Sequence, residues 1–177
     1  MIIFVFFVAW TVRCFHQAAP YIPLHGNSTF GYYFVNINVG SPKQKQSLII
    51  DTGSVSTIFV CQKCHLCNSH LNFVFDPEKS ASFEKVSSSR KGNGWSCGAN
   101  PLLLGKNDCE FEASYLEGST YTGYYARDFF TFDLRSSEND LKSPGERKKS
   151  SSGQKHTFGC AKSETNEFFR QAANGIL

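Results

Sequence analysis

The feature that most constrains the fold is a single acid between two apolar runs, in the stretch SLIIDTGSVSTIFV of residues 47–60. A carboxylate among apolar strands is costly unless hydrogen bonds or a partner compensate for its lost hydration, and such perturbed groups gather at functional sites. Thr52, Gly53 and Ser54 follow Asp51 directly, which predicts a tight loop between two strands. Asp51 is therefore a candidate catalytic residue, and the alternative is that it caps a turn.

The segments around this loop predict an all-β fold. Apolar and polar residues alternate from Tyr33 to Val39, which predicts a half-buried strand that ends at the turn 40–42. Further strands are predicted over Gln46–Ile50 and Val55–Val60, so that Asp51 follows a strand end. The 177 residues suffice for one domain with a core, and the 17 Phe and 7 Tyr suit a β-rich core.

Residues 109–134 predict a β-hairpin with a longer loop. Two aromatic-rich runs, Glu110–Leu116 and Thr120–Asp128, are separated by Glu117-Gly118-Ser119. The polar, low-complexity stretch of residues 136–155 then predicts a mobile loop that joins two strands.

Two further segments give weaker signals. A short helix is the best interpretation of Glu164–Ala173. The net charge is only +3, and much of the basic excess lies in KSPGERKK, residues 142–149. This pattern predicts a solvated loop and no nucleic-acid partner.

The N-terminus predicts a signal peptide. Residues 2–12, IIFVFFVAWTV, form an apolar run that fits the hydrophobic region of a signal peptide and is too short to span a bilayer. We favour cleavage after Cys14, giving a signal peptide of residues 1–14, because Pro20 disfavours cleavage after Ala19. A signal peptide of residues 1–19 and a short uncleaved anchor are the alternatives. Loss of Cys14 from the seven cysteines leaves an even number.

The cysteines define an insert over residues 61–109, which we expect to be a surface excursion ordered by cross-links. Its start, CQKCHLCNSH in residues 61–70, would be a candidate zinc or iron–sulfur site in a cytosolic chain. A signal peptide instead favours disulfides, because thiols oxidise in the secretory pathway. We therefore expect no metal and no cofactor. Six cysteines allow about 15 connectivities, and spacing alone does not choose among them.

Four segments in order resemble the N-terminal half of a pepsin-like aspartic protease. They are YYFVNINVGSPKQKQSLIIDTGSVSTIFV for the first strands and active-site loop, FDPEKSASFEKV for the next segment, ASYLEGSTYTGYYARD for the flap, and FGCAK to NGIL for the approach to the second core strand. A lone Asp-Thr-Gly is a weak signal, whereas this order is specific. The resemblance covers residues 30–177 and implies the N-terminal lobe of a bilobal enzyme.

The resemblance implies an aspartic endopeptidase in which two aspartates share a proton and activate water, one from each lobe. Asp51 would be the first aspartate, Thr52 would lock the two loops together, and Ser54 would orient Asp51. Gly53 would keep the approach open to substrate. Tyr115 matches the flap tyrosine, and its alternative interpretation is an ordinary strand aromatic.

The cysteine-rich insert resembles that of the nepenthesin-type and plasmepsin V-like branch. Carried over from nepenthesin, the pattern implies the pairs Cys61–Cys64, Cys67–Cys160 and Cys97–Cys109, although one inner pair of that pattern is missing here. The plasmepsin V-like resemblance, through SYLEGS, FGC and RQAANGIL, implies a secretory-pathway enzyme that cuts exported proteins at an arginine-containing motif.

In that branch, residues at two positions would hold the substrate arginine. Glu117 at the flap tip would pair with the guanidinium, and Gln171 would help to hold it. The flap would close on bound peptide, with Gly118 and Gly123 as points of flexibility. A solvated turn acid and a surface amide are the alternatives. Leu116 stands where the branch carries a free cysteine. Asn27, in Asn27-Ser28-Thr29, fits a glycosylation sequon.

The chain has no second Asp-Thr-Gly or Asp-Ser-Gly, and ends at Ile176-Leu177 where the family continues into a bracing glycine. We interpret it as the N-terminal half of a secreted peptidase, inactive alone, that lacks its C-terminal lobe; a membrane anchor beyond Leu177 remains open. The alternatives are a self-pairing half-protease with two copies of Asp51 and a non-catalytic peptide-binding module of the same fold. The expected partners are peptide or protein substrates.

Overall fold

The computed structural model describes residues 20–29, 31–87, 109–135, 149–150 and 153–177. These residues confirm the all-β prediction, because strands dominate and only short helices occur among them. In chain order the elements are β1 (His25–Asn27), β2 (Tyr32–Val39), β3 (Gln44–Ile49), β4 (Ile58–Val60), the 3-10 helix η1 (Pro77–Lys79), β5 (Glu84–Lys85), β6 (Glu110–Ser114), β7 (Thr120–Leu134), β8 (Lys149–Ser150), β9 (Gln154–Glu164), α1 (Asn166–Arg170) and β10 (Gly175–Ile176).

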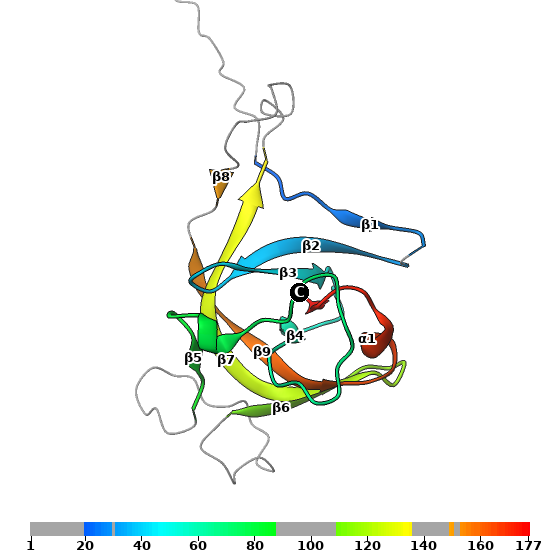
Figure 1. The fold of residues 1–177 in the computed structure, drawn as a ribbon. Helices are drawn as coiled ribbons and strands as arrows, with labels where there is room; N and C mark the ends of the chain where they lie inside the picture. The colour runs from blue at the N-terminus through cyan, green and yellow to red at the C-terminus, as the bar shows by residue number, and fades with distance from the viewer. Residues whose placement is uncertain (1–19, 30, 88–108, 136–148, 151–152) are drawn as a thin grey trace, which may run out of the picture.

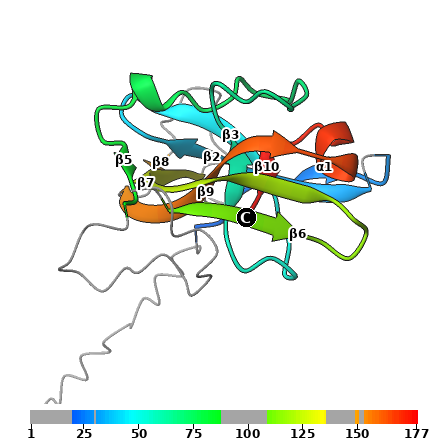
Figure 2. The same cartoon turned by 90° about the horizontal axis from the view of Figure 1, so that it is seen from below.

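The strands form one sheet that closes on itself. The strand order is β1-β2-β3-β10-β4-β9-β7-β5, with β6 and β8 also paired to β7. An additional pairing of β2 with β7, including Ile37 with Phe132, joins the second strand of this path to the last but one. Figures 1 and 2 show β7 and β9 as the longest strands, lying side by side across the molecule.

Two apolar clusters stabilise the closed sheet. The larger contains Phe59, which stacks on Phe158 at a centroid distance of 4.5 Å and meets Phe75 edge to face at 5.8 Å. The second contains Ile58, Phe111, Tyr121, Ala161, Phe168 and Ile176, and lies beneath α1 and the hairpin of β6 and β7. Offset and edge-to-face aromatic pairs add about 0.5–1.5 kcal/mol each beyond the burial of apolar area. The second cluster is the one that supports the site described below.

The C-terminal segment enters the middle of the sheet. β10 pairs in parallel with β3 and antiparallel with β4. Gly175 allows this insertion, because a Cβ there would lie 2.0 Å from the carbonyl oxygen of Ile58. The amide of Leu177 then donates to Ile49 at 2.8 Å. The segment therefore braces the strand that leads into Asp51.

Most predicted strands are present, with shifted ends. The strand predicted over Gln46–Ile50 is β3, which starts at Gln44 because Gln44 pairs with Val39 of β2. The strand predicted over Val55–Val60 is shorter than expected, since only Ile58–Val60 finds partners in β9 and β10 and the side chain of Val55 is fully exposed.

The hairpin and the short helix also end at other residues than predicted. The second hairpin arm, β7, runs on to Leu134 rather than Asp128 because its end pairs with β2 and β8. The short helix predicted over Glu164–Ala173 is reduced to α1. In the insert, Phe75 is fully buried in the core, so this segment is not wholly a surface excursion.

The disulfides differ from the pairing implied by nepenthesin. Cys61 is joined to Cys160 and Cys64 to Cys67, so the predicted pairs Cys61–Cys64 and Cys67–Cys160 are wrong. The reason lies in the sheet, since β4 runs parallel to β9 and the amide of Cys61 donates to Ala161. This register sets the fully buried Cys61 and Cys160 beside each other, and the remaining CxxC closes on itself.

Several predictions fall partly or wholly outside the described residues. They are the signal peptide over residues 1–14 or 1–19, most of the loop over residues 136–155, and Cys97. Cys109 is disulfide-bonded, and its predicted pairing with Cys97 stays a prediction. Within the described part of the chain, no helix is long and apolar enough to cross a membrane.

Candidate active site

Asp51 follows the end of β3 after one intervening residue, in a loop that fixes its carboxylate. Its Oδ1 accepts a hydrogen bond from the amide of Gly53 at 2.9 Å, and its Oδ2 accepts one from the hydroxyl of Ser54. Its own amide donates to Leu177 at 3.4 Å. Asp51 is half-buried, whereas Thr52 and Gly53 are exposed. The carboxylate is therefore held in one orientation and remains reachable from outside, rather than buried as its apolar flanks suggest.

A hydrogen-bonded chain connects Asp51 to the flap. The Ser54 hydroxyl has a single proton, which it donates to Asp51, so it accepts the hydrogen bond of the Tyr115 hydroxyl at 2.8 Å. Burial raises the pKa of Tyr115, and the negative charges of Asp51 and Glu117 act in the same direction. The phenol therefore stays protonated and can donate at any pH near neutrality.

The ring of Tyr115 is supported by α1. It meets Phe168 edge to face at a centroid distance of 4.8 Å, and Phe168 in turn stacks on the fully buried Tyr121 at 4.0 Å. Sequence alone did not single out Phe168, because its partners lie on the hairpin, far away in the chain. This aromatic stack fixes the height of Tyr115 above the Asp51 loop.

The flap tip is tied to the start of α1. The side-chain amide of Asn166 donates to the carbonyl of Gly118 at 2.7 Å, and the amide of Glu167 donates to the hydroxyl of Ser119 at 3.1 Å. Gly118 has a φ of +89°, a conformation that favours glycine. Leu116 points fully into solvent beside it. Figure 1 shows the hairpin tip close to α1.

The two residues that resemblance assigns to arginine binding lie at opposite ends of α1. Glu117 is exposed on the flap tip, which contacts the first turn of α1. Gln171 caps the other end, and its side-chain amide donates to the hydroxyl of Tyr121 at 3.0 Å. Gln171 is thus partly engaged within the lobe, and Glu117 is the freer of the two.

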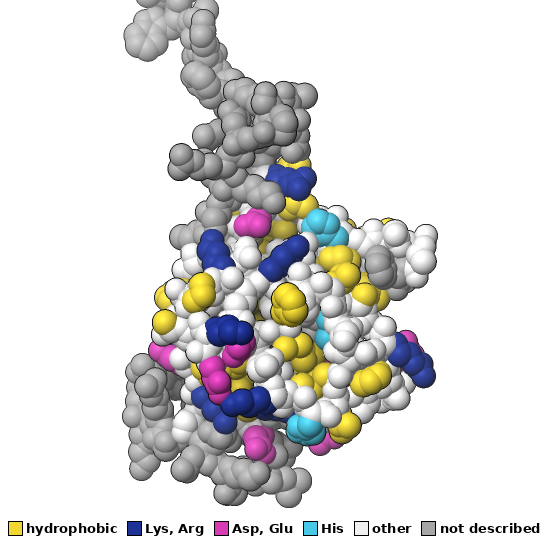
Figure 3. All heavy atoms as spheres, in the orientation of Figure 1, with side chains coloured by type: hydrophobic (Ala, Val, Ile, Leu, Met, Phe, Trp, Pro, Cys, Tyr) yellow, Lys and Arg dark blue, Asp and Glu magenta, His cyan; other side chains and the backbone are white. Residues whose placement is uncertain are grey.

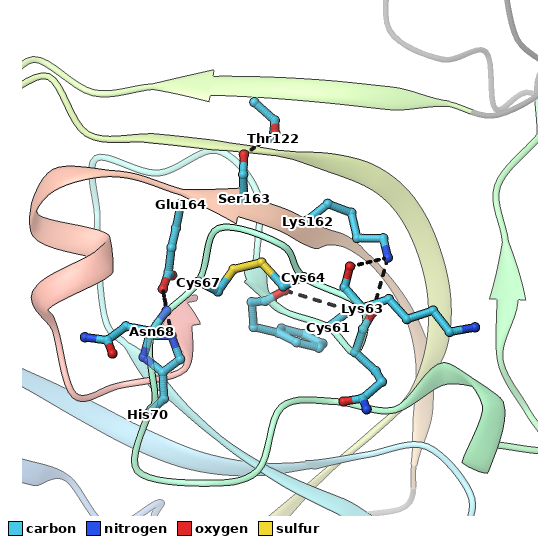
Figure 4. Close-up of a disulfide and its surroundings, with 12 residues drawn as sticks. Cys61, Lys63, Cys64, Cys67, Asn68, His70, Thr122, Lys162, Ser163 and Glu164 are labelled. Atoms are coloured by element: carbon cyan, nitrogen blue, oxygen red, sulfur yellow. Dashed lines mark hydrogen bonds and ion pairs between the residues drawn. A yellow bond between two sulfur atoms is a disulfide. The ribbon is translucent and has the colours of Figure 1, made fainter.

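The insert carries a buried histidine–carboxylate contact that sequence did not reveal. His70 lies 2.9 Å from a carboxylate oxygen of Glu164, and neither side chain has exposed area. Figure 4 shows His70 and Asn68 reaching Glu164 from the segment that follows the Cys64–Cys67 disulfide. The two residues are 94 positions apart, so no local pattern could have paired them.

No metal site is present among the residues that the structure describes, where no group of three His, Cys, Asp or Glu side chains could hold an ion. Cys61, Cys64 and Cys67 are consumed by disulfides, which removes the thiolates of the alternative zinc or iron–sulfur interpretation. On the face seen in Figure 3, Lys and Arg side chains alternate with Asp and Glu rather than forming one basic patch.

The remaining site prediction in the described residues concerns Asn27. It is exposed at the end of β1, and its side-chain oxygen accepts a hydrogen bond from the amide of Thr29 at 2.9 Å. Its glycosylation stays a prediction.

Comparison with known proteins gives the chain a family. Residues 33–177 match the family model described as xylanase inhibitor N-terminal, TAXi_N. Plasmepsin V of Plasmodium falciparum is 32% identical over 148 residues, which cover 84% of this chain and 22% of that protein. Aspartic protease 5 of Toxoplasma gondii is 32% identical over 159 residues, covering 84% of this chain and 15% of that protein.

A plant relative shows a shorter match. Aspartic proteinase nepenthesin-2 of Nepenthes gracilis is 33% identical over 110 residues, which cover 62% of this chain and 24% of that protein. The chain therefore spans less than a quarter of the length of each of these relatives. Together with the all-β lobe, the loop at Asp51 and the flap at Tyr115, these matches show that the chain belongs to the pepsin-like aspartic protease family.

Proposed function

We propose that this chain is the N-terminal lobe of an aspartic endopeptidase and supplies the first carboxylate of its catalytic pair. The observation that carries the proposal is the hydrogen-bonded chain from Tyr115 through Ser54 to Asp51. It joins the flap to the acid loop with every donor and acceptor matched.

The mechanism follows from the protons that these groups can hold and donate. The amide of Gly53 and the hydroxyl of Ser54 orient the carboxylate of Asp51, because each donates to one of its oxygens. A second carboxylate from a C-terminal lobe would share one proton with Asp51. One carboxylate would take a proton from water as the water attacks the peptide carbonyl, while the other gives its proton to the carbonyl oxygen. Thr52, exposed in the loop, would meet the second lobe.

The flap contributes water exclusion and orientation. Tyr115 donates towards the acid loop from above, and its ring is fixed by Phe168. A peptide lying between the flap and Asp51 would be shielded from bulk water, which strengthens each electrostatic contact there. Gly118 allows the tight turn at the tip, so backbone there can approach a substrate closely.

We propose that the substrate carries an arginine near the scissile bond. The exposed carboxylate of Glu117 stands at the flap tip, where a guanidinium could bind it in a bidentate manner. Gln171 would add a backbone or amide contact at the far end of α1. The relatives named plasmepsin V and aspartic protease 5 support a proteolytic role, and the arginine preference itself is the proposal.

The cellular setting is part of the same proposal. The disulfides of the insert suit an oxidising compartment, so we place the protein in the secretory pathway, in the endoplasmic reticulum lumen or secreted. Glycosylation of Asn27 and membrane association through a further segment would fit this route. The partners are a peptide or protein substrate and the second lobe, with no cofactor or metal.

The test is a peptidase assay on the complete gene product at acidic to mildly acidic pH. Arg-containing peptides should be cleaved, Asp51→Asn should abolish cleavage, and Glu117→Gln should raise KM for these peptides more than for lysine-free, arginine-free controls. Cleavage that survives Asp51→Asn would refute the proposal. Peptide binding without cleavage, unchanged in Asp51→Asn, would favour the non-catalytic module, and cleavage by a lone lobe that sediments as a dimer would favour the self-pairing form.

A further inference from the structure

His70 has an acceptor in front of each ring nitrogen. Nδ1 lies 3.2 Å from the backbone carbonyl oxygen of Gln171, and Nε2 lies 2.9 Å from Oε1 of Glu164. A carbonyl oxygen can only accept, so Nδ1 must carry a proton. A neutral ring would then present only a lone pair at Nε2 to the carboxylate. The contact therefore requires one more proton, held either by His70 as an imidazolium or by Glu164 as a neutral acid.

The other contacts of the Glu164 carboxylate show why this proton is needed. Glu164 Oε1 also accepts a hydrogen bond from the amide of Asn68 at 2.9 Å, whereas Oε2 is buried with no hydrogen-bond partner among the described residues. A buried carboxylate with a bare oxygen needs a compensating positive charge or a proton.

The other charged and titratable groups nearby are engaged elsewhere. Tyr121, on β7, receives a hydrogen bond from Gln171, and the negative charge of Glu164 adds to the burial that raises the Tyr121 pKa. Lys162, on β9, donates to two backbone carbonyls of the insert, as Figure 4 shows. Arg170, on α1, pairs with the exposed Glu167 at 2.8 Å. This leaves His70 as the partner of Glu164.

His70 holds a backbone segment that leads to Asp51. The carbonyl of Gln171 receives the Nδ1 hydrogen bond, and the next carbonyl, of Ala172, accepts from the amide of Leu71 at 2.7 Å. The same segment then forms β10 and ends at Leu177, whose carbonyl accepts from the amide of Asp51. The loop around His70 thus holds the chain end on which the acid loop rests.

We propose that His70 is a positioning residue: its two ring hydrogen bonds, to Glu164 and to the carbonyl of Gln171, clamp the backbone of Gln171 and, through residues 172–177, steady the loop of Asp51. The consequence for substrate binding at Gln171 rests on the proposed function. Removal of the imidazole would free the carbonyl of Gln171 and the segment that supports the acid loop.

The test compares three variants of the complete gene product. His70→Gln removes the imidazole, and Glu164→Gln provides a neutral amide that can donate to Nε2. His65→Gln is the matched control, since His65 is an exposed histidine of the same loop. Urea unfolding and peptide kinetics, both at one mildly acidic pH, are the readouts.

His65→Gln should leave stability and KM close to those of the wild type. His70→Gln should lower the stability to urea and raise KM for the Arg-containing peptide about tenfold, the effect of losing one or two hydrogen bonds, with kcat changed less. Glu164→Gln can still donate to Nε2, so its losses should be smaller than those of His70→Gln. The proposal is overturned if His70→Gln matches His65→Gln in both readouts, or if it lowers stability and leaves KM unchanged. Should the gene product cleave no peptide, the proposed function fails, while the difference in stability between His70→Gln and His65→Gln still decides whether the clamp exists.

Discussion

The hydrogen bond that Tyr115 donates to Ser54 can be separated from the one that Ser54 donates to Asp51. Tyr115→Phe removes the phenol oxygen and leaves the ring against Phe168, so only the first bond is lost. Ser54→Ala removes both bonds, because the same oxygen accepts one and donates the other. The double variant Ser54→Ala, Tyr115→Phe completes a cycle that measures how strongly the two sites depend on each other.

The type of each hydrogen bond sets the expected loss in kcat/KM. A bond between neutral groups contributes about 0.5–1.5 kcal/mol net, so Tyr115→Phe should lower kcat/KM roughly twofold to tenfold. A bond to a charged group contributes about 1.5–3 kcal/mol, so Ser54→Ala should lower kcat/KM roughly tenfold to a hundredfold. Once Ser54 is absent, the Tyr115 hydroxyl has lost its acceptor. Removing that hydroxyl as well should then cost nothing, which predicts a coupling of about 1 kcal/mol.

The assay is peptide cleavage by the complete gene product and its three variants at one acidic pH, with urea unfolding as the control for folding. Each variant should unfold close to the wild type, since the substitutions remove single oxygens near the surface. Losses in kcat/KM that add in the double variant would show that Tyr115 does not act through Ser54. The direction of the hydrogen-bond chain derived above would then be wrong.

Two further predictions concern stability. Because the Tyr121 pKa lies well above its ordinary value of 10.0, the unfolded chain loses that proton first; the free energy of unfolding should fall above pH 10, and Tyr121→Phe should reduce this fall in urea titrations. A fall of equal size in Tyr121→Phe would contradict this prediction. The Cys61–Cys160 bridge joins residues 99 apart, so the double Ser variant should lose about 4–5 kcal/mol, whereas the Cys64–Cys67 pair, separated by 3, should matter less in the same denaturation experiment. Equal losses would refute the ranking.

Sequence predicted the parts of the fold in which the interacting residues are close in the chain. The loop from Asp51 to Ser54 and the hairpin around Glu117-Gly118-Ser119 depend on turn residues between apolar runs, and both are present. Strand ends were less predictable, because they depend on partners elsewhere. Val55 looks like a strand residue and is fully exposed, since no neighbouring strand reaches it among the described residues.

The disulfides show a second limit of prediction from sequence. The pairs Cys61–Cys64 and Cys67–Cys160 follow from resemblance, but pairing is decided by which Cα atoms lie about 5–6 Å apart in the folded chain. β9 brings Cys160 next to Cys61, a neighbour 99 residues away that spacing could not show. With Cys160 bonded to Cys61, Cys67 pairs with Cys64.

The same reasoning explains why the support of the site was invisible in the sequence while its chemistry was not. The acid loop needs small and polar residues next to Asp51, and these are neighbours in the chain. Tyr115 was identified only through the resemblance of its flap. The groups that support the flap are distant in the chain: Asn166 is 48 residues from Gly118, and Glu167 is 48 residues from Ser119. Their roles follow only from the closed sheet, which brings the flap, α1 and β10 around one strand end. Substitutions in these supports should therefore alter the geometry at Asp51 without altering any residue that a sequence motif would contain.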